Sequence, residues 1–525
     1  MTKTKRSYDL STIYTVYFET LGCPKNVCDS ENAAGILERE GFRMAGAPES
    51  ADVIVVNTCG FIDDAKRESI AAIFEMAEHK KDGKRLVVSG CLSQRYGDEL
   101  ASELPEVDRF IGVHDYGRLP AILNEILGQG AAPNATTTQA ATAAQGATTQ
   151  AATAAQGATA QGAAAQGATA QGAAARDAAG AVQDAPGTPP AAGNTARLPR
   201  KRLEPVYSAF VKAADGCDNR CSYCVIPQIR GPYRSRPMDE IVYECETLVD
   251  GGAKEIVLIA QDLTAYGSDL HGQPALHTLA RRLCRIDGLR WLRLMYCYED
   301  RITDGLIEAM AAEDKICGYI DMPIQHINSR ILKSMRRHST QESIWRTIEK
   351  LRRAMPDIAI RTTLIAGFPG ESDSEFEELL DFVMQAKFDR LGAFAYSREE
   401  GTPAAEMEGQ IDDETKQARL EALMLAQQKI SLAKNRSMIG RTLEVLVEEE
   451  NGDGSFFGRT RRDAPEIDNG VIFSAAAGAA ASGTGFGADA VAGARPRVRP
   501  GDLVLVRIND AFDYDLAGEL VSPLP

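Results

Sequence analysis

The sequence predicts an α/β protein with three folded parts: an N-terminal parallel-sheet domain, a central partial barrel of six βα units and a small C-terminal β-barrel. Two observations carry this prediction. Short apolar runs alternate with helical patterns through the first two parts, which is typical of parallel sheets. The last part has short β-branched or alternating segments with turn signals. At 525 residues, the chain is also too long for one hydrophobic core.

The composition is that of an ordinary globular protein, with 44 % hydrophobic and 25 % charged residues. The formal net charge of −16 argues against a nonspecific nucleic-acid binder and allows a basic protein partner. The first residues lack the apolar core of a signal peptide, and no apolar run is long enough to span a membrane. Eleven cysteines then indicate metal or redox use in a reducing compartment, so we expect a cytoplasmic protein.

The first domain, residues 1 to about 127, repeats a strand-and-helix pattern. Strands are predicted at 14–18, 53–56 and 86–88, and helices at 30–40 and 63–80. A loop cysteine follows each strand: Cys23, Cys59 and Cys91. Because the same ends of parallel strands share one edge of a sheet, the three thiols should converge on one ligand. This placement favours a metal site over three separate buried thiols. Cys28 breaks the pattern and is interpreted as a packing residue.

Residues about 128 to 200 form a low-complexity insert. From 131 to 196 the chain is almost wholly Ala, Gly, Gln, Thr and Pro, and its one branched aliphatic residue is Val182. Such a segment cannot bury enough apolar surface to fold, so we predict disorder and assign it no chemistry.

The central domain, residues about 201 to 440, contains six further strand patterns. They lie at 208–213, 255–260, 291–296, 318–321, 359–365 and 390–395, with helical patterns between them, for example 239–250, 343–354 and 373–385. Six parallel βα units indicate an open partial barrel, with its site at the carboxyl ends of the strands.

A loop with three closely spaced cysteines follows the first of these strands. In Asp215-Gly-Cys-Asp-Asn-Arg-Cys-Ser-Tyr-Cys, the thiols of Cys217, Cys221 and Cys224 can hold three corners of an iron–sulfur cube and leave one iron open. A structural zinc site needs four ligands, usually in two pairs, and no second pair follows nearby. Three buried or zinc-bound thiols are the alternative.

The spacing of these cysteines resembles that of the radical S-adenosylmethionine superfamily. The resemblance implies a 4Fe–4S cluster on Cys217, Cys221 and Cys224, whose open iron chelates S-adenosylmethionine and whose electron cleaves it to a 5′-deoxyadenosyl radical. Tyr223 would lie near the adenine. Family analogy suggests further cofactor contacts at Gly251, Gly252, Gln261, Gln325, Gly367 and Gly370. The acidic residue expected beside the first two glycines is displaced to Glu255, and lone polar residues at strand ends are often only solvated.

A three-cysteine domain ahead of such a module resembles the methylthiotransferases, over nearly the whole chain outside its two low-complexity segments. The resemblance implies that Cys23, Cys59 and Cys91 hold a second, auxiliary 4Fe–4S cluster that carries or donates the sulfur. One S-adenosylmethionine would methylate this sulfur, and a second would yield the radical that activates the substrate. The family also implies an electron donor such as flavodoxin or ferredoxin, and leaves the sulfur donor open.

Two classes of methylthiotransferase compete: one modifies a tRNA adenosine, the other an aspartate β-carbon of small-subunit ribosomal protein twelve, which is very basic. The stretch Gly22-Cys-Pro-Lys-Asn26 resembles the second class, because tRNA enzymes typically have Gly-Cys-Gln-Met-Asn there. The stretches 57–65, 259–262, 395–402 and 458–468 resemble the same class, with departures at Leu263 and Arg398. A third possibility is a noncatalytic iron–sulfur ribosome-binding factor, although a purely structural cluster would require a fourth ligand.

The C-terminal domain, residues about 441 to 525, is predicted to be a small β-barrel with strands at 441–448, 501–508 and 515–521. It resembles the TRAM domain, elsewhere an RNA-binding barrel, and includes a predicted disordered loop at about 474–493. The domain has 8 Lys and Arg against 14 Asp and Glu, a net charge of −6. This balance favours a basic protein over RNA. A local group of Arg459, Arg461 and Arg462 keeps RNA as an alternative.

Overall fold

The computed structural model describes residues 13–81, 83–128, 199–203, 205–474 and 498–524. The two segments for which we predict disorder lie almost entirely outside these ranges. The described chain resumes at Pro199, and Arg200 is already buried in ion pairs with Glu31 and Glu244. No helix in these ranges is both long and apolar enough to cross a membrane.

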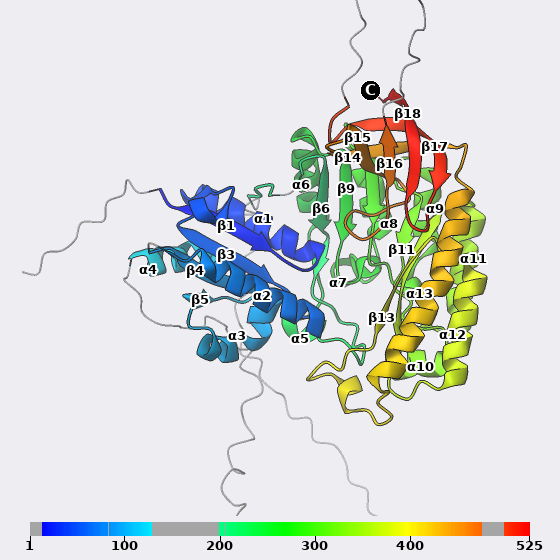
Figure 1. The fold of residues 1–525 in the computed structure, drawn as a ribbon, viewed down its shortest axis with the longest axis horizontal. Coiled ribbons are helices and arrows are strands. Elements are labelled where there is room, and N and C mark those ends of the chain that lie inside the picture. The colour runs from blue at the N-terminus through cyan, green and yellow to red at the C-terminus, as the bar shows by residue number, and fades with distance from the viewer. Residues whose placement is uncertain (1–12, 82, 129–198, 204, 475–497, 525) are drawn as a thin grey trace, which may run out of the picture. The chain divides into compact units, whose positions relative to one another are not determined.

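The N-terminal domain is a five-stranded parallel sheet in the order β2-β1-β3-β4-β5 (Figure 1). The strands are β1 (Thr15–Thr20), β2 (Arg43–Met44), β3 (Val53–Thr58), β4 (Arg85–Gly90) and β5 (Arg109–Phe110). The helices are α1 (Pro24–Arg39), α2 (Asp63–Glu78), α3 (Cys91–Glu103) and α4 (Leu119–Gly128). Helices α1 and α4 pack on one face and α2 and α3 on the other, so β3 is buried on both sides. The predicted parallel βαβαβ pattern is confirmed. The edge strands β2 and β5 were not predicted, because two residues are too few to show a periodic pattern.

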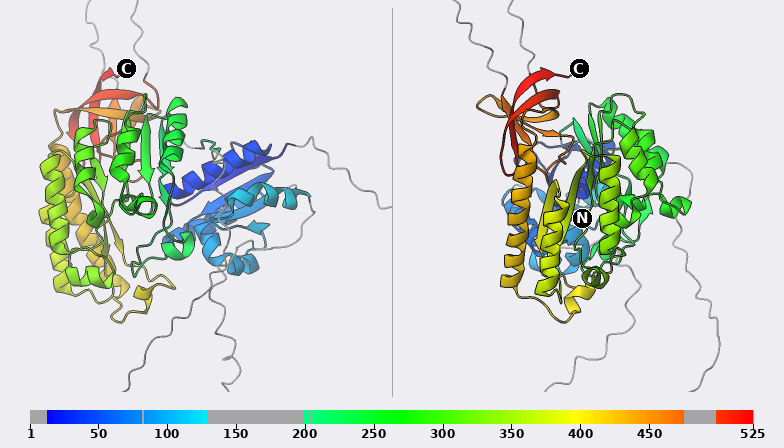
Figure 2. Two further views of the ribbon diagram at one scale, coloured as in Figure 1. Left: turned by 180° about the vertical axis from the view of Figure 1, so that it is seen from behind. Right: turned by 90° about the vertical axis from the view of Figure 1, so that its right-hand side faces the viewer.

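The central domain has six parallel strands in two three-stranded sheets, β6-β9-β10 and β11-β12-β13 (Figure 2). The strands are β6 (Ser208–Lys212), β9 (Glu255–Ile259), β10 (Trp291–Leu294), β11 (Tyr319–Asp321), β12 (Ala359–Ala366) and β13 (Arg390–Ala395). A bridge between Leu292 and Ile316, and a 2.9 Å hydrogen bond from Cys297 N to Asp321 O, join the two sheets. The predicted partial (βα)6 barrel is therefore confirmed.

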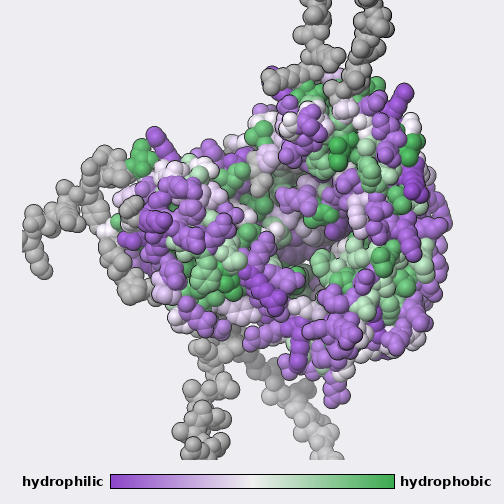
Figure 3. Space-filling view, in the orientation of Figure 1, coloured by the Kyte–Doolittle hydropathy of each residue, from purple (hydrophilic) through white to green (hydrophobic). Residues whose placement is uncertain are grey.

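Helices surround this barrel and bury its largest apolar cluster. They are α5 (Ile226–Arg230), α6 (Met238–Asp250), α7 (Ser268–His271), α8 (Leu276–Leu283), α9 (Asp304–Ala312), α10 (Ser329–Ser334), α11 (Gln341–Ala354), α12 (Asp373–Ala386) and α13 (Asp413–Arg436). On the face drawn in Figure 3, hydrophilic side chains predominate over the N-terminal domain and the barrel alike.

The C-terminal domain is a closed five-stranded barrel, as predicted, in the order β14-β15-β16-β18-β17. The strands are β14 (Thr442–Glu450), β15 (Ser455–Thr460), β16 (Val471–Ser474), β17 (Leu503–Ala511) and β18 (Leu516–Pro523). Leu446, Ala464 and Leu503 of this domain pack against Phe210 and Trp291 in the interior of the central barrel. The small barrel therefore contributes to the core of the large one.

A buried ionic triad fixes these two barrels together. Glu255, at the start of β9, accepts a 2.8 Å hydrogen bond from Arg293 of β10 and a 2.7 Å hydrogen bond from Arg459 of β15. All three side chains are buried. The acidic side chain that the family analogy suggested near the cofactor thus serves domain docking instead.

The arginines that kept RNA binding open face the central domain. Arg459 belongs to the buried triad, Arg461 donates to the carbonyl oxygen of Asp314, and Arg462 donates to that of Asp357. Their guanidinium groups are already engaged in contacts within the protein. The group therefore does not form a free cationic patch for phosphates.

Candidate functional site

The loop of Cys217, Cys221 and Cys224 follows β6 at the carboxyl end of the barrel and is fixed by its backbone. Cys217 N donates to Gly231 O at 3.1 Å, and Cys224 N donates to Cys221 O at 3.2 Å. Short antiparallel strands β7 (Ala214–Asp215) and β8 (Arg234–Ser235) hold the base of the loop. The three thiols are therefore presented from one short, closed segment.

Two glycines near this loop offer a matched test of its packing. Gly216 and Gly231 have φ angles of +75° and +73°, but a Cβ at Gly216 would collide with the carbonyl oxygen of Pro232, whereas one at Gly231 meets nothing within 4 Å. We expect Gly231→Ala to cost about 1 kcal/mol from its left-handed backbone alone. Gly216→Ala should cost about 2 kcal/mol more through overpacking. Urea unfolding of both variants measures the difference, and equal losses would contradict it.

In this loop Cys217 and Cys221 are buried and Cys224 is half-buried, and the three thiols are close enough to affect one another. Burial raises the pKa of Cys217 to about 11, with a further contribution from Cys221, while a hydrogen bond from the Asn219 backbone opposes the rise. Burial and the two neighbouring thiols also raise the pKa of Cys224. Without metal, Cys217 and Cys224 are therefore protonated, and iron binding would have to release their protons.

Two aromatic side chains and a buried cation border the loop. Tyr298 OH lies 3.9 Å from Cys221 Sγ, and the Arg337 guanidinium lies 4.1 Å from the Tyr298 ring centroid. Burial and the nearby Cys221 raise the pKa of Tyr223, which places its side chain at the same site. Arg337 Nε and Nη1 are buried without hydrogen-bond partners among the described residues. Sequence reasoning missed Tyr298 and Arg337, because neither belongs to a spaced motif.

The residues directly after β9 also reach the loop. Gln261 Nε2 donates to Asp215 Oδ1 at 3.1 Å, while Gln261 Oε1 is buried without a partner in the described chain. Asp262 accepts a 2.8 Å hydrogen bond from Asn219 Nδ2 and pairs with Arg301. The strand end therefore positions the cysteine loop and leaves one polar atom for a ligand.

Gln325 and Gly367 lie at the same end of the barrel, after β11 and β12. Gln325 has a φ of +74°, and its backbone bridges to β12. Gly367, also left-handed, is approached closely by the Lys416 side chain and donates its N–H to Glu371. Gly370, slightly further along, is exposed and donates its N–H to Gly409.

The structure does not bring Gly251 and Gly252 to the site. They end α6 and lead into the amino end of β9, whereas the cysteine loop follows the carboxyl end of the parallel neighbour β6. Both glycines are exposed at the opposite edge of the barrel. Their proposed contact with the cofactor is corrected, because a glycine pair that precedes a parallel strand lies away from the binding edge.

Cys23, Cys59 and Cys91 gather at the carboxyl edge of the N-terminal sheet. Cys23 is the N-cap of α1, Cys59 follows β3, and Cys91 begins α3. A Cβ on Gly22 would lie 2.7 Å from Cys59 Cβ, so only glycine fits beside that thiol. Burial raises the pKa of Cys59 to about 12, with contributions from both other thiols. No three Cys, His, Asp or Glu side chains in the described ranges are arranged as a single-ion site.

The segment that follows the three-cysteine loop contacts the N-terminal cysteine set directly. Arg230 of α5, six residues after Cys224, donates to Asn26 Oδ1 at 2.8 Å and lies 3.6 Å from Cys91 Sγ. Cys91 packs in one apolar cluster with Val225, the residue that follows Cys224. The segment after the loop set thus reaches the N-terminal set, a contact that sequence spacing cannot reveal.

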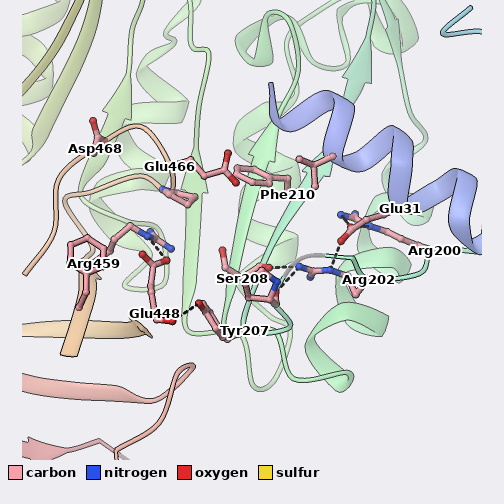
Figure 4. A pocket seen from close by; sticks show the side chains of 14 residues that line it. Glu31, Arg200, Arg202, Tyr207, Ser208, Phe210, Glu448, Arg459, Glu466 and Asp468 are labelled. Carbon is pink, nitrogen blue, oxygen red and sulfur yellow. Dashed lines mark hydrogen bonds and ion pairs between the residues drawn. The ribbon is translucent and has the colours of Figure 1, made fainter. Parts of the chain in front are cut away.

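A cavity of about 430 Å³ lies apart from both sets, where α1, the chain before β6 and the C-terminal barrel meet (Figure 4). Glu31 of α1 pairs there with Arg202, and Tyr207 OH donates to the Glu448 carbonyl at 3.2 Å. Cys28 lies near this junction, buried, with its Sγ donating to Phe210 O, and is a packing residue as predicted. The cysteines of the two sets do not line the cavity.

Comparisons with known proteins agree with this architecture. Three family models match the chain in order: Uncharacterized protein family UPF0004 over residues 15–112, the Radical SAM superfamily over 211–383 and the TRAM domain over 439–521. The ribosomal protein uS12 methylthiotransferase RimO of Geobacter sulfurreducens is 42 % identical over 516 residues, covering 96 % of this chain and 98 % of that protein.

Two further relatives have the same name. The protein of Pelobacter propionicus is 43 % identical, with 95 % of this chain and 96 % of the relative covered. The protein of Clostridioides difficile is 40 % identical, with 97 % of this chain and 99 % of the relative covered. Since these similarities extend over almost the whole chain, the protein belongs to the RimO family of radical S-adenosylmethionine methylthiotransferases.

Proposed function

We propose that this enzyme adds a methylthio group to the β-carbon of an aspartate in ribosomal protein uS12. The observation that carries the proposal is the contact between α5, the helix that follows the three-cysteine loop, and Cys91 of the N-terminal cysteine set. Two such sets fit a reaction that needs one centre for radical generation and another for sulfur.

The residues present fit two iron–sulfur clusters. Each set offers three neighbouring thiols and no fourth cysteine, and a backbone N–H hydrogen-bonds to Cys217, Cys224 and Cys59. The unpartnered Gln261 Oε1 and Arg337 N–H groups border the loop set. A 4Fe–4S cluster on Cys217, Cys221 and Cys224 would supply the electron that cleaves S-adenosylmethionine, and one on Cys23, Cys59 and Cys91 the sulfur.

The chain's own groups arrange and shield this chemistry. Asp262 and Asn219 fix the cysteine loop, and Tyr223 and Tyr298 cover it with aromatic surface. Arg230 holds the two cysteine sets in register through Asn26 and an ion pair with Asp29 at 2.8 Å. These contacts would hold the two centres in a fixed arrangement for a substrate carbon.

Charge supports a basic protein substrate. The chain has a net charge of −16, and the three grouped arginines of its C-terminal domain are engaged internally. An acidic enzyme attracts a basic ribosomal protein more readily than RNA. We propose that it acts in the cytoplasm with flavodoxin or ferredoxin as electron donor.

Anaerobic turnover tests this proposal. Reconstituted enzyme, S-adenosylmethionine and a reductant are incubated with a peptide of the aspartate-bearing loop of uS12 and, separately, with prenylated-adenosine tRNA. We expect mass spectrometry to find one methylthio group on the aspartate and none on the tRNA. The reverse result would assign the enzyme to the tRNA class, and no S-adenosylmethionine cleavage would leave a noncatalytic factor.

A further inference from the structure

Lys25 is a buried lysine without an acidic partner among the described residues. It lies in the first turn of α1 with a side chain only 7 % exposed, and its Nζ is 3.2 Å from the centroid of the Tyr296 ring. Neither an ion pair nor a hydrogen bond joins this ammonium group to any residue that the structure describes. By contrast, the nearby buried cations Lys212 and Arg230 each contact both Asp29 and Asp215.

The acids closest to Lys25 are committed elsewhere. Asp215 contacts Lys212 and Arg230, and Asp321 forms a 2.7 Å ion pair with Arg361. Asp321 also accepts the backbone N–H of Tyr296. Tyr296 therefore holds its ring under the ammonium group with an uncommon φ of +60°. Contacts on either side fix this arrangement, and no carboxylate of the described residues contacts Lys25 Nζ.

Burying an ammonium group is unfavourable unless it is paired, and a ring beneath it offsets only part of the cost. A carboxylate that entered beside Tyr296 would complete the pair with a charge-assisted hydrogen bond. The location suits a substrate group. Lys25 is two residues from Cys23, and Tyr296 follows β10 at the carboxyl end of the barrel, where Cys217 also lies.

We propose that Lys25 binds the side-chain carboxylate of the substrate aspartate and selects it over uncharged residues. The inference rests on the proposed function, since the carboxylate is that of the modified residue. The β-carbon is bonded directly to this carboxyl group, so holding the carboxylate also fixes the carbon that reacts. Lys25 is thus a substrate-binding residue that determines specificity.

Peptide binding by the reconstituted full-length enzyme tests this role. Fluorescence anisotropy compares a labelled uS12 loop peptide with the same peptide carrying asparagine at the target position. We expect the wild type to prefer the aspartate peptide by about tenfold to a hundredfold, as for a hydrogen bond to a charged group. Lys25→Met, of similar length, should bind both peptides equally, whereas Lys25→Arg should retain a preference. Lys429→Met, on the exposed surface of α13, is the matched control and should behave as wild type.

Other results would overturn the inference. If Lys25→Met kept the aspartate preference, the ammonium group would not touch the carboxylate. If Lys25→Met lost iron, Lys25 would serve the auxiliary site. If its affinity for both peptides fell by the same factor, Lys25 would serve the fold. Iron analysis and thermal unfolding of the variant distinguish these results. In each of these cases the wild-type enzyme would still modify the aspartate, so the proposed function would stand. Failure of the proposed function would instead appear as an unmodified peptide with the wild type itself.

Discussion

Replacing Cys217 with alanine should abolish S-adenosylmethionine cleavage and leave the auxiliary site loaded. Two thiols cannot replace three around an iron–sulfur cube, so the loop cluster should be lost. Since each cube has four irons, the iron content of reconstituted protein should fall from about eight to about four per chain. The rate of 5′-deoxyadenosine formation should fall by more than about a hundredfold. Such a loss is larger than that caused by removing a hydrogen bond to a metal ligand.

Two variants separate loss of a ligand from loss of a buried thiol. Cys284→Ala, which removes a buried thiol from the outer core of the barrel, should leave both iron content and cleavage unchanged. Cys59→Ala should retain cleavage and lose methylthio transfer, because Cys59 belongs to the other set. If Cys217→Ala kept eight irons and full cleavage, the assignment of the loop cysteines would be wrong.

The positions of the cysteines in the fold could be predicted from sequence because the information that places them is local. Cys217, Cys221 and Cys224 lie within eight residues, and Cys23, Cys59 and Cys91 each follow a recognisable strand. Parallel topology then brings the second set to one edge without knowledge of the tertiary packing. Fold class was predictable for the same reason, since the alternation of strands and helices is written along the chain.

The remainder of the site depends on contacts between distant segments. Arg230 meets Cys91 across 139 residues, and Lys25 meets Tyr296 across a domain boundary. Gly251 and Gly252 were misplaced because the family analogy was followed against the strand rule: they precede β9, so they lie at its amino end, away from the edge where the site was expected. The arginines of β15 and its following loop seemed available for RNA for a similar reason: Glu255, the partner of Arg459, is 204 residues away.

The Glu255 triad should dominate the docking of the C-terminal barrel. In Glu255→Gln, Arg293 and Arg459 remain buried without their shared carboxylate, and removing one member of a buried ionic group costs about 3–5 kcal/mol. We expect the free energy of the unfolding transition that releases the C-terminal barrel, measured by urea titration, to fall by that amount. Glu246→Gln, on the exposed face of α6, is the matched control and should change stability by less than about 0.5 kcal/mol.

The same triad should make the free energy of unfolding decrease at low pH. Burial alone would raise the pKa of Glu255, but Arg459 and Arg293 lower it from 4.5 to about 2. Because the folded pKa lies below the unfolded one, the contribution is complete above about pH 4.5 and is lost as the pH falls towards 2. The difference in stability between wild type and Glu255→Gln should therefore shrink across this interval. A difference that stayed constant would show that the carboxylate charge does not hold the two barrels together, and that the glutamine variant is weakened by altered packing alone.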